Sequence, residues 1–371
     1  MSERAGSPPA ERPIGELEQV FAFYGAMPTG IAVSHQGRIF VNYPRWGDPV
    51  DFSVAELRDG REVPFPNAEI NREGLLNDQN HLVSVQSVVI DPEDRLWMLD
   101  TGSPLHMDTE HGGPKLVCVN LASNSVTRTI LFPTDVALPT SYLNDVRFDL
   151  GRGSRGTAYI TDSSARGPNA IIVVDLASGE SWRRLNDHPT TKAEPLVAFM
   201  PIVEGRPFLR RHADGEVGPG AVGGVDGIAI SEHGQRIYYS PLGSRYLHSV
   251  LAEALVDRGF DDAAVAATLI AEGDKGGGGD GLESDDDGGI YATNYEQNAI
   301  LRRGANGIWE TLVKDPRLLW PDSLAVASNG YLYAIANQLH RQGRYHAGHD
   351  LRQKPYALFR IRIDHEPVLL R

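Results

Sequence analysis

One short sequence pattern occurs six times along this chain of 371 residues. Each copy starts with a polar residue and continues through a short apolar run, a tight turn and a second apolar run. The clearest copies begin at Asp226, Asp280 and Asp322. The pattern is typical of a β-hairpin, and hairpins that recur every 40–50 residues or so are typical of propeller blades. The predicted fold class is all-β: a six-bladed β-propeller of four-stranded antiparallel blades.

The six copies are unevenly spaced. Their first polar residues are Thr29, Gln86, Asn144, Asp226, Asp280 and Asp322. Neighbouring positions lie 42 to 58 residues apart, except that 82 residues separate Asn144 from Asp226. We therefore expect an insertion over residues 186–224, a stretch rich in Gly and Pro. Loops of this length are usually functional or disordered, so the insertion is either a lid over the ring or a plain surface excursion.

The two ends of the chain are predicted to pair and close the ring. Residues 16–24 and 356–363 both have strand patterns, and their pairing would remove two exposed sheet edges. We expect a flexible tail over residues 1–15 and one propeller domain over residues 16–371.

Two short helices are expected outside the six hairpins. Residues 51–58 can form one, with Gly60 at its end, followed by a loop over residues 61–80. Residues 257–267 can form the other, between two outer strands.

Composition excludes several classes of partner. The net charge of −14 argues against a nucleic-acid or anionic-membrane partner, and no apolar run reaches the length of a membrane span. A single cysteine, Cys118, excludes an internal disulfide. Residues 1–13 lack the apolar segment of a signal peptide. A cytoplasmic protein with a small-molecule ligand is expected, or a secreted one if a signal was trimmed; the oligomeric state stays open.

Several segments resemble a known family. They are 44–46, 84–91, 96–102, 141–145, 158–163, 226–230, 238–242 and 320–324. In this order they are similar to the signature segments of the major royal jelly protein/yellow family. The resemblance implies a six-bladed propeller. Some family members bind biogenic amines in the central channel, some are credited with dopachrome isomerisation, and microbial members are functionally diverse. The chain departs from the insect members in lacking a signal peptide and cysteine pairs, which argues against secretion and pigment chemistry.

The polar residues that start the six hairpins are predicted to share one site. The inner strands of a propeller begin around one mouth of its central channel, so these side chains should face one another. An Asp or Asn before Gly can instead cap a local turn. Two carboxylates about 8 Å apart repel by roughly 2 kcal/mol at an effective dielectric constant of about 20. Three in one channel therefore need a cation, a basic side chain or a retained proton.

The site residues are assigned from these positions. The predicted catalytic residues are Asp226, Asp280 and Asp322. The predicted ligand-binding residues are Thr29, Gln86 and Asn144 at the starts of first strands, with Asp100, Asp162, Asn294 and Asn337 at the ends of second strands.

A divalent metal is a second expectation for the same mouth. Oxygen ligands suit Ca²⁺, Mg²⁺ or Mn²⁺. The layout also resembles the sugar-lactonase propellers, which hold a divalent metal at strand starts. That resemblance implies Asn144, Asp226 and Asp280 as ligands. Thr29 stands where that pattern has a glutamate, and Asp322 is the candidate substitute.

Three further groups of residues are weaker candidates. The last blade has a basic loop that is either solvated or a rim for anionic substrate groups; it contains His340, Arg341, Arg344, His346, His349 and Arg352. Three histidines flank the inner strands of the second blade, and one of them is a candidate general acid or base in the channel; they are His81, His106 and His111. Residues 285–287 are expected to form a solvated acidic turn, with surface calcium as the alternative.

Three functions are compatible with these residues. The first is binding of a small organic metabolite, with isomerase- or cyclase-type chemistry at the channel mouth. The second is metal-dependent hydrolysis of the lactonase type, in which the ion polarises a carbonyl group and activates water. The third is a non-catalytic ligand-binding or interaction scaffold.

Overall fold

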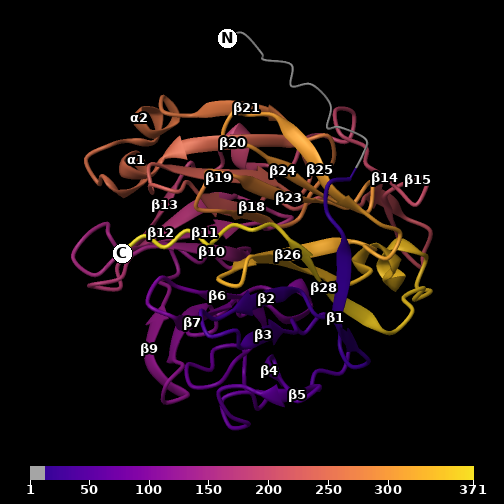
Figure 1. The fold of residues 1–371 in the computed structure, drawn as a ribbon, viewed down its shortest axis with the longest axis horizontal. Helices are drawn as coiled ribbons and strands as arrows, with labels where there is room; N and C mark the ends of the chain where they lie inside the picture. The colour runs from indigo at the N-terminus through magenta and orange to yellow at the C-terminus, as the bar shows by residue number, and fades with distance from the viewer. Residues whose placement is uncertain (1–12) are drawn as a thin grey trace.

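Six four-stranded antiparallel sheets form a ring around a central channel (Figure 1). The computed structural model describes residues 13–371. Every inner strand contacts the inner strands of both neighbouring blades, which closes the ring. The six predicted hairpins are the inner strand pairs of the six blades, so the predicted six-bladed β-propeller is confirmed.

Each blade is described from its innermost strand outward. Blade 1 is β2 (Gly30–Val33), β3 (Ile39–Asn42), β4 (Val54–Arg58) and β5 (Arg61–Pro64). Blade 2 is β6 (Val85–Ile90), β7 (Arg95–Asp100), β8 (Lys115–Asn120) and β9 (Ser125–Leu131). Blade 3 is β10 (Leu143–Asp149), β11 (Thr157–Asp162), β12 (Ala170–Asp175) and β13 (Ser181–Arg184). Blade 4 is β18 (Val225–Ile230), β19 (Arg236–Pro241), β20 (Tyr246–Leu251) and β21 (Ile270–Asp274). Blade 5 is β22 (Leu282–Ser284), β23 (Ile290–Asn294), β24 (Ala299–Arg303) and β25 (Trp309–Lys314). Blade 6 is β26 (Pro321–Ala327), β27 (Tyr331–Ala336), β28 (Tyr356–Arg362) and β1 (Leu17–Phe23).

The two ends of the chain meet in blade 6. Strand β1 pairs with β28 from Leu17 opposite Ile361 to Phe23 opposite Tyr356, so the predicted terminal pairing is confirmed. The predicted tail over residues 1–15 lies mostly outside the described residues. At its end, the Gly15 N–H donates to a carbonyl oxygen of blade 5 at 2.7 Å.

The short helix expected over residues 51–58 is wrong, because this segment forms strand β4 and part of the predicted loop forms β5. Asp59 and Gly60 join the two strands with φ values of 51° and 71°. Positive φ at both central residues is the geometry of a two-residue type I′ hairpin turn. Gly60 therefore makes a tight turn and does not end a helix.

Of the other predicted helix, over residues 257–267, only the second half is helical, and a further short helix precedes the predicted range. The two helices are α1 (Ala252–Val256) and α2 (Asp262–Ala266), which lie between β20 and β21. The Asp261 side chain caps α2 by accepting the Ala264 N–H at 2.8 Å. None of the described helices is long and apolar enough to cross a membrane.

The insertion between blades 3 and 4 folds into two small hairpins. They consist of β14 (Ile202–Val203) with β15 (Arg206–Pro207), and β16 (Leu209–Arg211) with β17 (Val217–Pro219). Phe208 anchors the insertion, because its ring contacts those of Tyr295, Trp320 and Tyr345 at centroid distances of 6.5, 5.0 and 4.5 Å. The insertion thus packs on blades 5 and 6.

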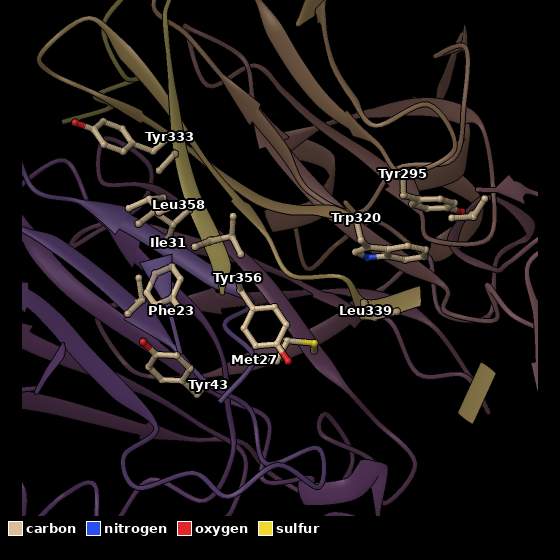
Figure 2. Packing of buried hydrophobic residues seen from close by; sticks show 14 of the residues in the cluster. Phe23, Met27, Ile31, Tyr43, Tyr295, Trp320, Tyr333, Leu339, Tyr356 and Leu358 are labelled. Atoms are coloured by element: carbon tan, nitrogen blue, oxygen red, sulfur yellow. The ribbon is translucent and has the colours of Figure 1, made fainter. Parts of the chain in front are cut away.

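One hydrophobic cluster joins the closing blade to blade 1 and to the insertion. In Figure 2, Phe23 lies beside Tyr43, and their ring centroids are 6.3 Å apart. Figure 2 also shows Tyr295 next to Trp320; the two rings are stacked at 4.2 Å. Both rings are fully buried, so they form a rigid support for the neighbouring residues of the channel mouth.

The opposite end of the channel is filled. Arg147 forms ion pairs with Asp145 at 3.0 Å and with Glu283 at 3.3 Å inside the ring. The last residues of the chain run across this end (Figure 1), where Pro367 and Val368 line a narrow cavity of about 70 Å³. Among the described residues, this end of the channel therefore leaves little room for a ligand.

Candidate functional site

A cavity of about 350 Å³ lies at the mouth where the inner strands begin. Its floor consists of Gln86, Asn144, Asp226, Asp280 and Asp322, and each is at most 9% exposed. Five of the six residues predicted from the hairpin starts therefore lie together. The sixth, Thr29, does not line the cavity.

Irregular strand pairing directs these side chains toward the channel. The register of the inner strand pair shifts at Gln86, at Asn144, at Asp226 and at Asp322. Such a β-bulge removes a residue from the regular ladder and re-aims its side chain. The pair β2–β3 has no shift. Instead, the Thr29 hydroxyl donates to the Gln86 carbonyl oxygen at 3.2 Å, so Thr29 supports the bulge of the next blade.

Glycine follows two of the aspartates because the neighbouring backbone comes very close. A Cβ atom on Gly227 would lie 2.5 Å from the Asp280 carbonyl oxygen. A Cβ atom on Gly281 would lie 2.4 Å from the Asp322 carbonyl oxygen. The Asp-Gly pattern thus marks where adjacent inner strands converge on the channel.

The aspartate side chains do not cap local turns. Asp280 accepts a hydrogen bond from the indole N–H of Trp320 at 2.8 Å, across 40 residues of sequence. Asp322 accepts one from the Asn337 side chain. Local turn capping, the alternative to a shared site, therefore does not account for Asp280 or Asp322.

Burial is the main influence on the three carboxyl groups. Loss of hydration, followed by the charge of Asp280, raises the pKa of Asp226 well above its ordinary value. Loss of hydration also raises the pKa of Asp280 and, with the charge of Asp280, that of Asp322. A hydrogen bond between Asp226 and Asp280 raises the pKa of Asp226 further and counteracts the rise at Asp280. These shifts favour a proton on Asp226 over one on Asp280.

The floor offers oxygen ligands only, which is the donor chemistry of a hard divalent cation. Its three carboxyl groups do not, however, bring one oxygen each within 4.8 Å of one another. A cation here would therefore need the amide oxygens of Asn144 or Gln86 besides one or two carboxylates.

A group that does meet this distance combines Asp285 and Asp286, in the acidic turn after β22, with His365, which follows β28. The turn was expected to be solvated, but Asp285 is fully buried. Asp285 already accepts the Gly289 N–H at 2.6 Å and the Tyr291 hydroxyl at 2.7 Å. These bonds fix the turn.

One wall of the cavity is aromatic and is tied to the floor. The Trp46 indole N–H donates to the Tyr142 hydroxyl at 2.7 Å, and that hydroxyl donates to the Gln86 side chain at 2.9 Å. The His106 ring stacks on Trp46 at 5.1 Å. Trp46 and Tyr142 were not predicted as site residues, although both lie in the family segments 44–46 and 141–145.

The rim of the cavity is basic and includes Arg166, Arg210 and Arg344. Arg344 donates a hydrogen bond to Nε2 of His106 at 3.0 Å. His106 is open to solvent but sits in a concave mouth. Loss of hydration there, with the charges of Arg344 and Arg210, lowers the pKa of His106 below its ordinary value. His106 is thus a neutral group at the working pH of most proteins.

Most other basic residues named from the sequence lie outside the cavity. Within the basic loop, Arg341 pairs with Glu204 and Arg352 pairs with Asp48 at 2.7 Å, so Arg344 alone of its arginines lines the cavity. Among the three histidines of blade 2, His106 reaches the cavity, whereas His81 bonds to Asp78 at 2.8 Å. His111 does not line the cavity.

The structure places two of the other predicted ligand-binding residues outside the cavity. Asp100 accepts three backbone N–H groups, from Val83 at 2.7 Å, Ser84 at 2.8 Å and Gly102 at 3.0 Å, and pairs with Lys115 at 3.1 Å. Asp162 accepts the Tyr142 N–H at 2.9 Å and thereby holds the start of β10. Both carboxylates fix the loops that precede the inner strands.

Asn294 and Asn337, the two asparagines predicted at the ends of second strands, also bond to neighbouring loops. Asn294 donates to the Gly276 carbonyl oxygen at 3.3 Å and does not line the cavity. Asn337 donates to the Pro28 carbonyl oxygen at 3.1 Å as well as to Asp322. Asn337 is therefore a positioning residue for a carboxyl group of the floor.

The six-bladed ring places the chain among the β-propellers, and two solved structures have the same fold. The first is a gluconolactonase from Xanthomonas campestris, with a TM-score of 0.55, 13% identity and coverage of 97% of this chain and 98% of that chain. The second is a calcium-binding protein, regucalcin, from Agrobacterium tumefaciens, with a TM-score of 0.54, 13% identity and coverage of 95% and 97%. At this identity the likeness shows the fold alone.

Sequence comparison then gives the family: the chain belongs to the major royal jelly protein family, whose profile matches residues 83–364. Major royal jelly protein 1 of Apis mellifera is 28% identical over 228 residues, which cover 58% of this chain and 48% of that protein. Protein yellow of Drosophila melanogaster is 26% identical over 244 residues, which cover 62% and 42%. The chain spans about half the length of the curated relatives it matches. The family predicted from the sequence segments is confirmed.

Proposed function

We propose that this protein is an enzyme that moves a proton within a small organic substrate, with isomerase-type chemistry, at the mouth of the propeller channel. The observation that carries the proposal is the buried pair Asp226 and Asp280, which lines a cavity of about 350 Å³ and whose pKa values are raised by burial. Two carboxyl groups whose environment separates their pKa values can serve as acid and base in one site.

The roles follow from the hydrogen bond between the two groups. Asp226 holds the proton and donates it to one atom of the substrate, while ionised Asp280 takes a proton from another atom. The proton then returns from Asp280 to Asp226 through their hydrogen bond. The substrate is isomerised without a net change of protons, and no oxidant is consumed. Trp320 holds Asp280 in place, and Asn337 holds Asp322 as the third polar group around the reacting atoms.

Hydrogen exchange with solvent tests this proposal even while the substrate is unidentified. Aromatic and hydroxy- or keto-acid metabolites would be incubated with the enzyme in D₂O and analysed by mass spectrometry. Wild type should introduce deuterium into at least one compound. Asp226→Asn should slow that exchange by about 100-fold or more, the usual contribution of a general acid. Asp214→Asn, an exposed carboxylate of the insertion, is the control and should match wild type.

Metal-dependent hydrolysis is the second candidate, because the floor pairs carboxylates with the amide groups of Asn144 and Gln86. The cation would be held by Asn144, Asp226 and Asp280, and when bound it would polarise a substrate carbonyl group. Melting curves with Ca²⁺, Mg²⁺, Mn²⁺ and EDTA decide between the two candidates. A tightly bound ion raises the melting temperature by mass action, and Asp280→Asn should abolish that rise. Unchanged curves would leave the proton-transfer proposal.

A further inference from the structure

We propose that Arg210 and Arg344 form an oxyanion-binding pair at the rim of the cavity, so that the substrate carries a carboxylate or phosphate group. This group would lie at the end of the substrate remote from the carboxyl floor. The inference rests on the proposed function and deepens it, because it assigns the chemical class of substrate for the same cavity.

Neither arginine has a carboxylate partner within residues 13–371, in a chain with 49 acidic and 35 basic residues apart from histidine. The neighbouring arginines behave differently. Arg166 pairs with Asp108 at 2.5 Å, Arg352 pairs with Asp48 at 2.7 Å, and Arg341 pairs with Glu204. Two unpaired guanidinium groups beside one cavity of an acidic protein indicate that their counter-charge comes from a ligand.

Hydrogen bonding leads to the same conclusion. The Nε atoms of Arg210 and Arg344 are shielded from solvent and have no partner among the described residues. Arg344 instead donates through Nη1 to His106, whose ring can supply no negative charge. A buried N–H of a charged group without an acceptor is unfavourable. An oxyanion has several lone pairs and matches the planar fork of donors on a guanidinium group.

The two arginines come from different segments that are held together before any ligand binds. Arg210 lies in β16 of the insertion, and Arg344 lies in the short 3₁₀ helix η4 (Gly343–Tyr345) of blade 6. The Ala347 N–H donates to the Arg211 carbonyl oxygen at 2.9 Å and joins the segments. The Arg344 guanidinium group also lies over the Tyr345 ring at 5.1 Å. Little side-chain freedom is then lost on binding, which favours affinity.

The arrangement makes the cavity bipolar. The rim carries positive charge, the floor carries carboxyl groups, and an aromatic wall connects them. An aromatic or otherwise flat organic anion would place its charged group at the rim and its reacting atoms above Asp226 and Asp280. A neutral compound of the same shape would leave both arginines without acceptors and should bind more weakly.

Calorimetric titration with matched probes tests the pair. Phenylacetate and phenylacetamide have nearly the same shape and differ in charge, and inorganic phosphate is the third probe. Wild type should bind phenylacetate about tenfold or more tightly than phenylacetamide, as expected for a hydrogen bond to a charged group. Arg210→Gln and Arg344→Gln should each reduce this preference to about twofold or less. Arg210→Lys should restore part of it.

Arg211→Gln is the matched control, because Arg211 is the neighbouring residue of β16 and does not line the cavity; it should keep the wild-type preference. Tight binding of phosphate, lost in the same two variants, would assign the pair to phosphorylated substrates. Equal affinity for acid and amide, no binding of any anionic probe, or a preference that survives both Gln substitutions would overturn the proposal.

The experiments distinguish failure of the proposed function from failure of the rim proposal. Asp226→Asn should keep the preference for the anion while it slows deuterium exchange by about 100-fold or more. Equal affinity of wild type for phenylacetate and phenylacetamide, with deuterium exchange intact, would contradict the rim assignment alone.

Discussion

The three buried carboxyl groups of the floor lower the stability of the native state; they belong to Asp226, Asp280 and Asp322. A buried carboxylate without a basic partner destabilises the native state unless it keeps a proton or is hydrogen-bonded. Asp280 has the Trp320 indole as a donor and Asp322 has the Asn337 amide, whereas burial raises the pKa of Asp226 and so favours its protonated form. Residues that lower stability in this way are typically retained for a site.

Trp320 illustrates the same cost. Its φ of 57° lies in the left-handed region, which is unusual for a bulky residue. Such a conformation costs on the order of 1–3 kcal/mol. Stacking on Tyr295 at 4.2 Å and the bond to Asp280 hold the indole in place. We infer that the strained backbone is maintained because it positions this donor.

The raised pKa values predict that stability depends on pH. Above pH 3.8, the ordinary pKa of aspartate, the unfolded chain releases protons that the native floor keeps. The free energy of unfolding should therefore fall as the pH rises from about 4 through the folded pKa values, by up to about 1.4 kcal/mol per pH unit for each proton. The double variant Asp226→Asn/Asp322→Asn cannot lose these protons and should gain stability over wild type as the pH rises.

Urea unfolding between pH 5 and pH 9 measures this difference, with Asp214→Asn as the exposed control. Parallel stability curves for wild type and the double variant would show that the floor holds no extra proton.

At the scale of the strand, the site depends on bulges and on glycines that follow its aspartates. We expect Gly227→Ala to push β18 away from the Asp280 backbone, because the new Cβ would lie 2.5 Å from that carbonyl oxygen. The free energy of unfolding should fall by about 1–3 kcal/mol, as for other overpacked sites. Gly25→Ala, at a position with no atom within 4 Å, is the control and should change stability by less than about 0.5 kcal/mol. Similar losses in both variants would contradict the close approach of the strands.

The strands also show how much of the site could be predicted from the sequence. The Asp-Gly steps and the spacing of the hairpins predict the floor, because the channel imposes a common position on all six starts. Thr29 does not join it, since β2 has no bulge, and a bulge has no local sequence signal of its own. The type I′ turn at Asp59-Gly60 could have been recognised from its residue types.

The wall and rim could not be predicted in the same way. Arg210 and Arg344 are about 130 residues apart in the sequence and meet because the insertion packs on blade 6. Trp46 and Tyr142 lie in family segments, but their hydrogen bond depends on two loops from different blades. Contacts of this kind follow from the closed ring and not from any local pattern.

For the whole molecule, pairing of the termini makes the ring continuous and fixes the distance across the channel. Phe23 of β1 is fully buried in the cluster that joins blades 6 and 1. Phe23→Ala should lower the free energy of unfolding by about 3–5 kcal/mol, the usual cost of an aromatic-to-alanine change in a core. Tyr24→Ala, one residue on and 69% exposed, should change it by about 0.5 kcal/mol or less. Chemical denaturation measures the free energy of unfolding of both variants. Equal effects of the two changes would mean that pairing of the termini contributes little to stability.

Within residues 13–371, the two ends of the channel differ in how much room they offer a ligand. Arg147 and its ion pairs fill the channel, and the chain end lies across the far side. The cavity at the mouth where the inner strands begin lies between the insertion and the basic loop, because both segments supply lining residues.

The shared proton is the central claim, and infrared spectroscopy of the carboxyl groups measures it most directly. Difference spectra at pH 7 in the presence of EDTA, wild type minus Asp226→Asn and wild type minus Asp280→Asn, report protonated carboxyl stretches separately from ionised ones. We expect a protonated carboxyl band in wild type that both variants alter and that Asp214→Asn leaves unchanged. Spectra in which every carboxyl group of the wild-type floor is ionised at pH 7 would contradict the account.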